Sequence, residues 1–143
     1  CASPIKAYKK PNCYIGRPKE TERLKKVLEQ QGVCILHGYG GSGKSTLACH
    51  YAQNVSESAE QQMAWFIPSD SSGKIQTGFQ DIAARLGIDY RALIELWKLD
   101  PRKYRQELSR AIYDALDESG QCLLVILDNV RILVGNLQPV VPC

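Results

Sequence analysis

The chain has 143 residues, and its 18 Lys and Arg against 15 Asp and Glu leave a formal net charge of +3. This length allows the hydrophobic core of one domain, and basic residues spread along the chain argue against a nucleic-acid partner. No apolar run approaches the roughly 18 residues that a membrane span needs, and no secretory leader pattern opens the chain. We therefore expect a cytoplasmic protein that binds neither nucleic acid nor membrane.

The six cysteines form no C-x-x-C pair and have no zinc-ligand spacing. Cys34 and Cys122 fall in predicted strands and Cys49 in a predicted helix. We expect these three to be reduced and to fill the core as small apolar side chains.

In chain order, Pro4, Pro11 and the lack of periodicity predict an extended lead-in over residues 1–13, followed by one domain over 14–143. Apolar residues at helical spacing after Pro18 predict a helix up to Gln30. Gly32 ends this helix, and the apolar run 33–37 predicts a central parallel strand buried on both faces.

Residues 38–46 then read Gly-Tyr-Gly-Gly-Ser-Gly-Lys-Ser-Thr, which fits the phosphate-loop pattern G-x-x-x-x-G-K-[ST]. Glycines let the backbone turn several N–H groups toward one point, where a helix N-terminus adds its positive end. Lys44 is placed to reach the β- and γ-phosphates, and Ser45 to coordinate Mg²⁺. A flexible loop with a chance lysine is the alternative, and the flanking strand and helix favour the phosphate site.

The rest of the chain alternates further strands and helices. A helix follows the loop, and residues 63–67 predict a strand that Pro68 ends. Three helical stretches come next: one with Ile82 and Ala83 on its apolar face, a loosely specified one over 88–99, and one that starts with Asp100 as N-cap and Pro101 as first residue. The last predicted strand covers residues 122–127.

Asp128 directly follows that strand, and Asn129 comes after it. Alone, an aspartate at a strand end is more often a turn residue. Together with the phosphate loop it suggests a Walker B aspartate, which holds Mg²⁺ from the side opposite Ser45. Asn129 carries an amide, which can orient water by hydrogen bonding and cannot accept its proton.

Strands alternating with helices predict an α/β fold, a three-layer P-loop NTPase with a parallel sheet and flanking helices. In such sheets ligands bind at the carboxyl ends of the strands, where both the loop and Asp128 fall. The length leads us to expect a fold that is incomplete at its C-terminus.

Four segments together resemble the nucleotide-binding domain of STAND-class P-loop NTPases. They are the run Tyr14-Ile15-Gly16-Arg17 with Glu20 and Leu24, the loop, the strand at 64–67 and the segment 124–128. Within that class the chain is most similar to the NB-ARC group of AP-ATPases, and next to the NACHT group. The resemblance implies an ADP/ATP-dependent signalling switch that uses Mg²⁺, self-associates, and is joined to effector and repeat domains. Hydrolysis is at most slow, because Asn129 stands where the family often has a second aspartate.

The resemblance also implies roles for single residues. Lys44 and Asp128 are the candidate catalytic residues, and Ser45 and Asp128 the candidate metal ligands. Ile15, Gly16 and Arg17 match the segment that lines the adenine pocket, largely through its backbone. The full set expected to bind the nucleotide is Ile15, Gly16, Arg17, Gly38, Gly40, Gly41, Ser42, Gly43, Lys44, Ser45 and Thr46.

Two other functions use the same loop. A P-loop kinase would need a substrate lid with converging arginines, and a GTPase would need a guanine-reading Asn-Lys-x-Asp, which the chain lacks. A degenerate interaction module that keeps the fold and no longer binds nucleotide is the third alternative.

Overall fold

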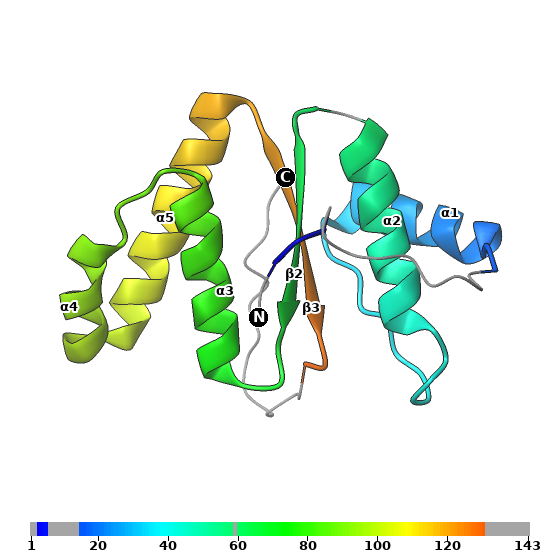
Figure 1. The fold of residues 1–143 in the computed structure, drawn as a ribbon, viewed down its shortest axis with the longest axis horizontal. Coiled ribbons are helices and arrows are strands. Elements are labelled where there is room, and N and C mark those ends of the chain that lie inside the picture. The colour runs from blue at the N-terminus through cyan, green and yellow to red at the C-terminus, as the bar shows by residue number, and fades with distance from the viewer. Residues whose placement is uncertain (1–2, 6–14, 59, 131–143) are drawn as a thin grey trace.

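The computed structural model of the protein describes residues 3–5, 15–58 and 60–130. In this part of the chain, a sheet of three strands lies between helical layers (Figure 1). The strands are β1 (Ser3–Pro4), β2 (Gln62–Pro68) and β3 (Cys122–Asp128), and the helices are α1 (Pro18–Gln31), α2 (Lys44–Ser58), α3 (Ser72–Arg85), α4 (Arg91–Leu99) and α5 (Pro101–Ser119). The predicted α/β class is confirmed. Most of the lead-in predicted for 1–13, and residues 131–143 of the domain predicted for 14–143, lie outside the described residues.

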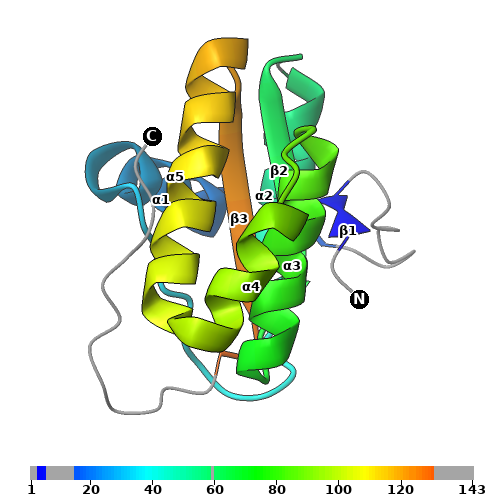
Figure 2. The ribbon, with the colours of Figure 1, turned by 90° about the vertical axis from the view of Figure 1, so that its left-hand side faces the viewer.

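The centre of the fold is the parallel pair of β2 and β3, in register from Gln62 beside Cys122 to Pro68 beside Asp128. Because side chains alternate along a strand, this pair supplies two cores. Trp65 and Ile67 pack with the helices α3 and α5, which cover one face, and α4 packs on α5 on the side away from the sheet (Figures 1 and 2). Ala64 packs on the other face, in a cluster with residues of α2. The predicted parallel sheet with flanking helices is therefore present.

The helix boundaries follow from local signals. The Asp100 side chain accepts hydrogen bonds from the N–H groups of Arg102 and Lys103, at 3.0 and 3.1 Å, as expected for the predicted N-cap before Pro101. Gly120 ends the same helix with φ 63°. These contacts are made within a few residues of the chain, so the sequence pattern is sufficient to place them.

The strand predicted for residues 33–37 is wrong, because this segment joins no strand of the described sheet. Ile35 is 76% exposed, where a central strand would bury it. A strand forms only when a neighbour accepts and donates its backbone hydrogen bonds. Among the described residues, β3 pairs with β2 and does not pair with residues 33–37. The segment instead runs unpaired from α1 to the phosphate loop.

A short strand that the sequence pattern did not indicate lies at the other edge of β2. Ser3 and Pro4 pair antiparallel with Phe66 and Trp65. Ile5 follows and is only 1% exposed, in the cluster that also holds Ala64. Two residues are too few for a periodic pattern, so only the tertiary structure reveals this strand.

The predicted core position is confirmed for one cysteine and wrong for two. Cys49 is buried in the core between α2 and the sheet, as predicted. Cys122 is exposed at the first position of β3, and Cys34 is half-buried in the unpaired segment, so core positions were wrong for these two. In the described ranges no helix is both long and apolar enough to cross a bilayer.

Gly78 is the point of closest approach between α3 and β2. A Cβ built there would lie 2.6 Å from the Ile67 side chain, which is fully buried. We expect Gly78→Ala to lower the free energy of unfolding by about 1–3 kcal/mol, the usual cost of overpacking a core. Chemical denaturation measures this change.

Gly73 is the matched control, since it lies in the first turn of the same helix and its Cβ would meet nothing within 4 Å. Gly73→Ala should be neutral or stabilising through helix propensity alone. If Gly78→Ala were equally harmless, or if Ile67→Ala, which removes the side-chain carbons that this Cβ would meet, did not relieve part of its cost, the close packing of these elements would be disproved.

Candidate functional site

The structure brings the phosphate loop and Asp128 together at the carboxyl end of the sheet. Ser45, in the first turn of α2, donates a hydrogen bond from Oγ to Asp128 Oδ1 at 2.5 Å. These residues lie 83 positions apart in the chain. The neighbouring strand ends at the same level, where the N–H of Ser69 donates to the Asp128 carbonyl oxygen at 2.7 Å. The residues predicted as metal ligands are therefore adjacent.

The loop owes its shape to its glycines. Gly41 and Gly43 adopt φ values of 75° and 80°, which L side chains rarely adopt. The N–H of Ser42 donates to the Tyr39 carbonyl oxygen at 3.2 Å and closes a turn around Gly40. Every residue of the loop from Gly38 to Gly43 is exposed. The loop thus presents its backbone to solvent, as a site for an external anion requires.

The N-terminus of α2 directly follows the last glycine of the loop, Gly43. An α-helix leaves its first N–H groups without intrahelical acceptors, and Ser71 and Asp100 supply such acceptors at α3 and α5. At α2 the corresponding N–H groups belong to residues 43–46, ending with the half-buried Thr46. They share this end of the helix with the positive pole of its dipole. These donors fit a phosphate group.

The ammonium group of Lys44 is held against the inner side of the loop. Its Nζ donates to the carbonyl oxygens of Gly38 and Tyr39 at 3.0 and 2.8 Å, and to Ser42 Oγ at 3.3 Å. An ammonium group has three donors, and these acceptors use all of them. The positive charge is thus fixed inside the loop, where exchanging one of these neutral acceptors for a phosphate oxygen would give a stronger, charge-assisted bond.

The pair Ser45 and Asp128 suits Mg²⁺. This cation prefers oxygen ligands and is commonly held by one or two protein groups together with phosphate oxygens and water. The Ser45 hydroxyl can donate its proton to Asp128 and still offer a lone pair to a cation. In the described ranges no cluster of three or more His, Cys, Asp and Glu could hold a metal by itself. The two oxygen groups of Ser45 and Asp128 fit a cation that takes its remaining ligands from phosphate and water.

Asn129 adopts a left-handed backbone conformation, with φ 58°. Asparagine and aspartate are the side chains that tolerate this conformation best after glycine, because their short polar groups bond locally. The turn after β3 therefore accounts for an asparagine here independently of any catalytic role.

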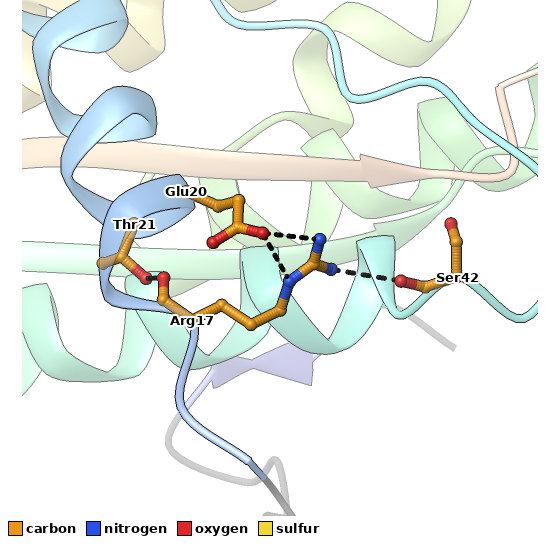
Figure 3. Close-up of polar contacts among 4 residues, drawn as sticks. All are labelled: Arg17, Glu20, Thr21 and Ser42. Atoms are coloured by element: carbon orange, nitrogen blue, oxygen red, sulfur yellow. Dashed lines mark hydrogen bonds and ion pairs between the residues drawn. The ribbon is translucent and has the colours of Figure 1, made fainter.

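The three residues expected at the adenine side lie just before α1. Ile15 is 84% exposed and Gly16 is exposed as well, so the described residues do not enclose a base there. Arg17 reaches the phosphate loop with its side chain, since Nη1 donates to the Ser42 carbonyl oxygen at 3.1 Å (Figure 3). A backbone role was expected for Arg17, and the observed contact is made by its guanidinium.

Glu20 holds that guanidinium, a contact that its place in the family motif did not indicate. Its Oε1 accepts from Arg17 Nε and Nη2 at 3.1 and 3.0 Å. A hydrogen bond from the backbone N–H of Glu20 itself, and after it the Arg17 side chain, lowers the pKa of this carboxyl. The spacing of three residues at a helix start could have indicated the pair.

Comparison with known proteins gives one family. The sequence model of the family described as "AAA domain" matches residues 26–136, from α1 through the phosphate loop to beyond Asp128. No curated protein and no solved structure matches the chain.

The thiol of Cys49 should be chemically inert. Burial, and after it the negative charge of Asp128, raises the pKa of Cys49 to about 11. Since the thiolate is the reactive form, we expect iodoacetamide at pH 7.5 to modify the exposed Cys122 and leave Cys49 intact. Peptide mass spectrometry of the folded protein measures both, and denaturation before labelling is the control. Rapid modification of Cys49 in the folded state would contradict this burial.

Proposed function

The chain belongs to the AAA domain family, a group of P-loop NTPase domains, and from this premise we propose that it binds ADP and ATP together with Mg²⁺. The observation that carries the proposal is the hydrogen bond between Ser45 and Asp128. A phosphate loop alone could be a chance Gly-rich turn. An aspartate from a distant strand, bonded to the hydroxyl of that loop, is what a Mg²⁺–phosphate site requires and a chance turn does not.

Each residue then has a defined part. The phosphate oxygens accept hydrogen bonds from the N–H groups of residues 43–46 and from the Lys44 ammonium. Ser45 and Asp128 hold the cation. Bound there, Mg²⁺ supplies positive charge that offsets the charge of the phosphates. Ile15, Gly16 and the backbone of Arg17 are proposed to lie along the adenine.

We further propose that turnover is slow and that the domain acts as a signalling switch of the STAND type. The amide of Asn129 can orient a water molecule and cannot take its proton. A domain that hydrolyses ATP slowly keeps one nucleotide bound for a long time. It can then stay in one of two conformations, and the γ-phosphate of ATP shifts the equilibrium between them. The resemblance to NB-ARC domains supports self-association and attachment to effector or repeat domains in the full-length protein.

A cytoplasmic location and a single nucleotide-binding domain over residues 14–143 belong to the same proposal. Cys34, Cys49 and Cys122 are free thiols, which suits a reducing compartment with abundant ATP.

Removing the loop ammonium tests nucleotide binding. We expect Lys44→Ala to raise the Kd for ADP and ATP by tenfold or more, because a charge-assisted hydrogen bond to phosphate contributes about 1.5–3 kcal/mol. Titration of wild type and variant with ADP, ATP and GTP, with and without Mg²⁺, followed calorimetrically and by thermal shift, measures it. In wild type, ligand at 100 times its Kd should add about 2.7 kcal/mol of stability.

Lys103→Ala is the control, since this exposed lysine lies in α5, in the helical layer on the opposite side of the sheet from α2. Equal binding by wild type and Lys44→Ala would reject the proposed site. A preference for GTP would favour a GTPase, and no binding at all would favour a degenerate interaction module.

The second test concerns hydrolysis. We expect Asn129→Asp to raise single-turnover ATP hydrolysis by about tenfold or more, because a carboxylate can act as general base. Aspartate also tolerates the left-handed backbone, so the fold should not change. Asn129→Gly, which keeps the backbone and removes the side chain, should not gain activity. Identical rates for wild type and Asn129→Asp would place residue 129 away from the attacking water.

A further inference from the structure

Arg17 links the start of α1 to the phosphate loop, with Thr21 and Glu20 as its partners in α1 and Ser42 as its partner in the loop. Its carbonyl oxygen accepts from the N–H and the Oγ1 of Thr21, at 2.9 and 2.8 Å. Its guanidinium is held by Glu20 and donates to the Ser42 carbonyl oxygen across 25 positions of sequence (Figure 3). Backbone and side chain of this one residue are therefore both anchored, and the loop is tied to the helix.

The fork of the guanidinium explains the direction of this contact. Glu20 takes Nε and Nη2, on one edge of the planar group, so Nη1 is left for the loop. The same Nη1 would lie 3.7 Å from a Cβ built on Gly43, so the cation rests against the peptide that joins Ser42 to Gly43. A lysine could not make both sets of contacts with one ammonium group.

A peptide group is planar and trans, so its C=O and N–H point in opposite directions. The hydrogen bond from Arg17 to the Ser42 carbonyl oxygen therefore points the Gly43 N–H away from α1. Gly43 is a glycine at φ 80°, and without an anchor its peptide is free to rotate. A rotated peptide would offer a carbonyl oxygen, and not an N–H, to an incoming anion.

We propose that the Arg17 side chain is a positioning residue of the phosphate loop, which holds the Ser42–Gly43 peptide in the orientation that binds phosphate and couples nucleotide binding to the first turn of α1. This inference rests on the proposed nucleotide binding. It gives the Arg17 guanidinium a role at the phosphates, whereas the family resemblance implies only a backbone contact to adenine.

Stability of the fold is not the reason for the pair. Arg17 and Glu20 keep 40% and 47% of their side-chain surfaces exposed. An ion pair this accessible contributes little to folding. We expect the pair to order the phosphate loop. A ligand that binds only the ordered loop then also stabilises the start of α1, because binding and ordering are thermodynamically linked.

Four variants separate positioning from stability. Arg17→Ala should raise the Kd for ADP about tenfold, the effect of losing one charge-assisted hydrogen bond, and leave the melting temperature of the nucleotide-free protein unchanged. Arg17→Lys should recover part of the affinity, and Glu20→Gln should cause a smaller loss in the same direction. Arg23→Ala, an exposed arginine of the same helix with no ion pair among the described residues, should bind as wild type does.

Hydrogen exchange provides a readout that a purely structural role would not change. Saturating ADP should slow amide exchange in residues 19–24 of wild type and of Arg23→Ala, and should not do so in Arg17→Ala. Calorimetry and exchange on the same samples show whether the loss of affinity and the loss of protection occur together.

The outcomes distinguish this inference from the proposed function. If binding depends on Lys44 and Arg17→Ala binds ADP as tightly as wild type, the positioning role is refuted while nucleotide binding stands. If Arg17→Ala and Arg23→Ala lose affinity equally, general helix charge and not the Ser42 contact is responsible, and the inference fails. If wild type binds no nucleotide, the proposed function fails first and the inference with it.

Discussion

The hydrogen bond between Ser45 and Asp128 joins the two halves of the site, and the rest of the structure determines whether it can form. Ser45 stands at the start of α2, which packs on β2 and β3 through Cys49 and Ala52. Asp128 stands at the end of β3, whose register is set residue by residue against β2. A shift of one residue between these strands would turn Asp128 to the opposite face of the sheet.

That register depends in turn on the cores on both faces. Trp65 and Ile67 are held by α3 and α5, and Ala64 by α2, so β2 cannot slide without opening both clusters. Gly78 allows α3 to approach Ile67 closely enough to close one of them. The polar site is therefore positioned by apolar packing at some distance from it, which is the usual way in which a rigid scaffold positions a functional loop.

The phosphate loop itself has little apolar support. Its residues are exposed, and its shape comes from glycine conformations, from the three acceptors of Lys44 and from the contact with Arg17. Such a loop is ordered by a few hydrogen bonds, each of modest net contribution. A ligand that replaces or reinforces them can change the order of the neighbouring segments.

The sequence by itself determined those features whose interactions are local in the chain. The helix ends at Asp100 and Gly120 and the glycines at 41 and 43 follow from bonds or dihedral preferences within a few residues. The approach of Asp128 to the loop also followed, because parallel strands end at one edge of a sheet.

Only the tertiary structure decided the features that need a distant partner. An apolar run becomes a strand only where a neighbour bonds to it, so residues 33–37 stay unpaired while Ser3 and Pro4, with no pattern of their own, form β1. In the same way, Arg17 could be recognised by its place in a motif, but the atom that its guanidinium contacts became known only when the loop and α1 were placed side by side. Contacts between residues far apart in sequence depend on the packing of the whole chain, which no local pattern contains.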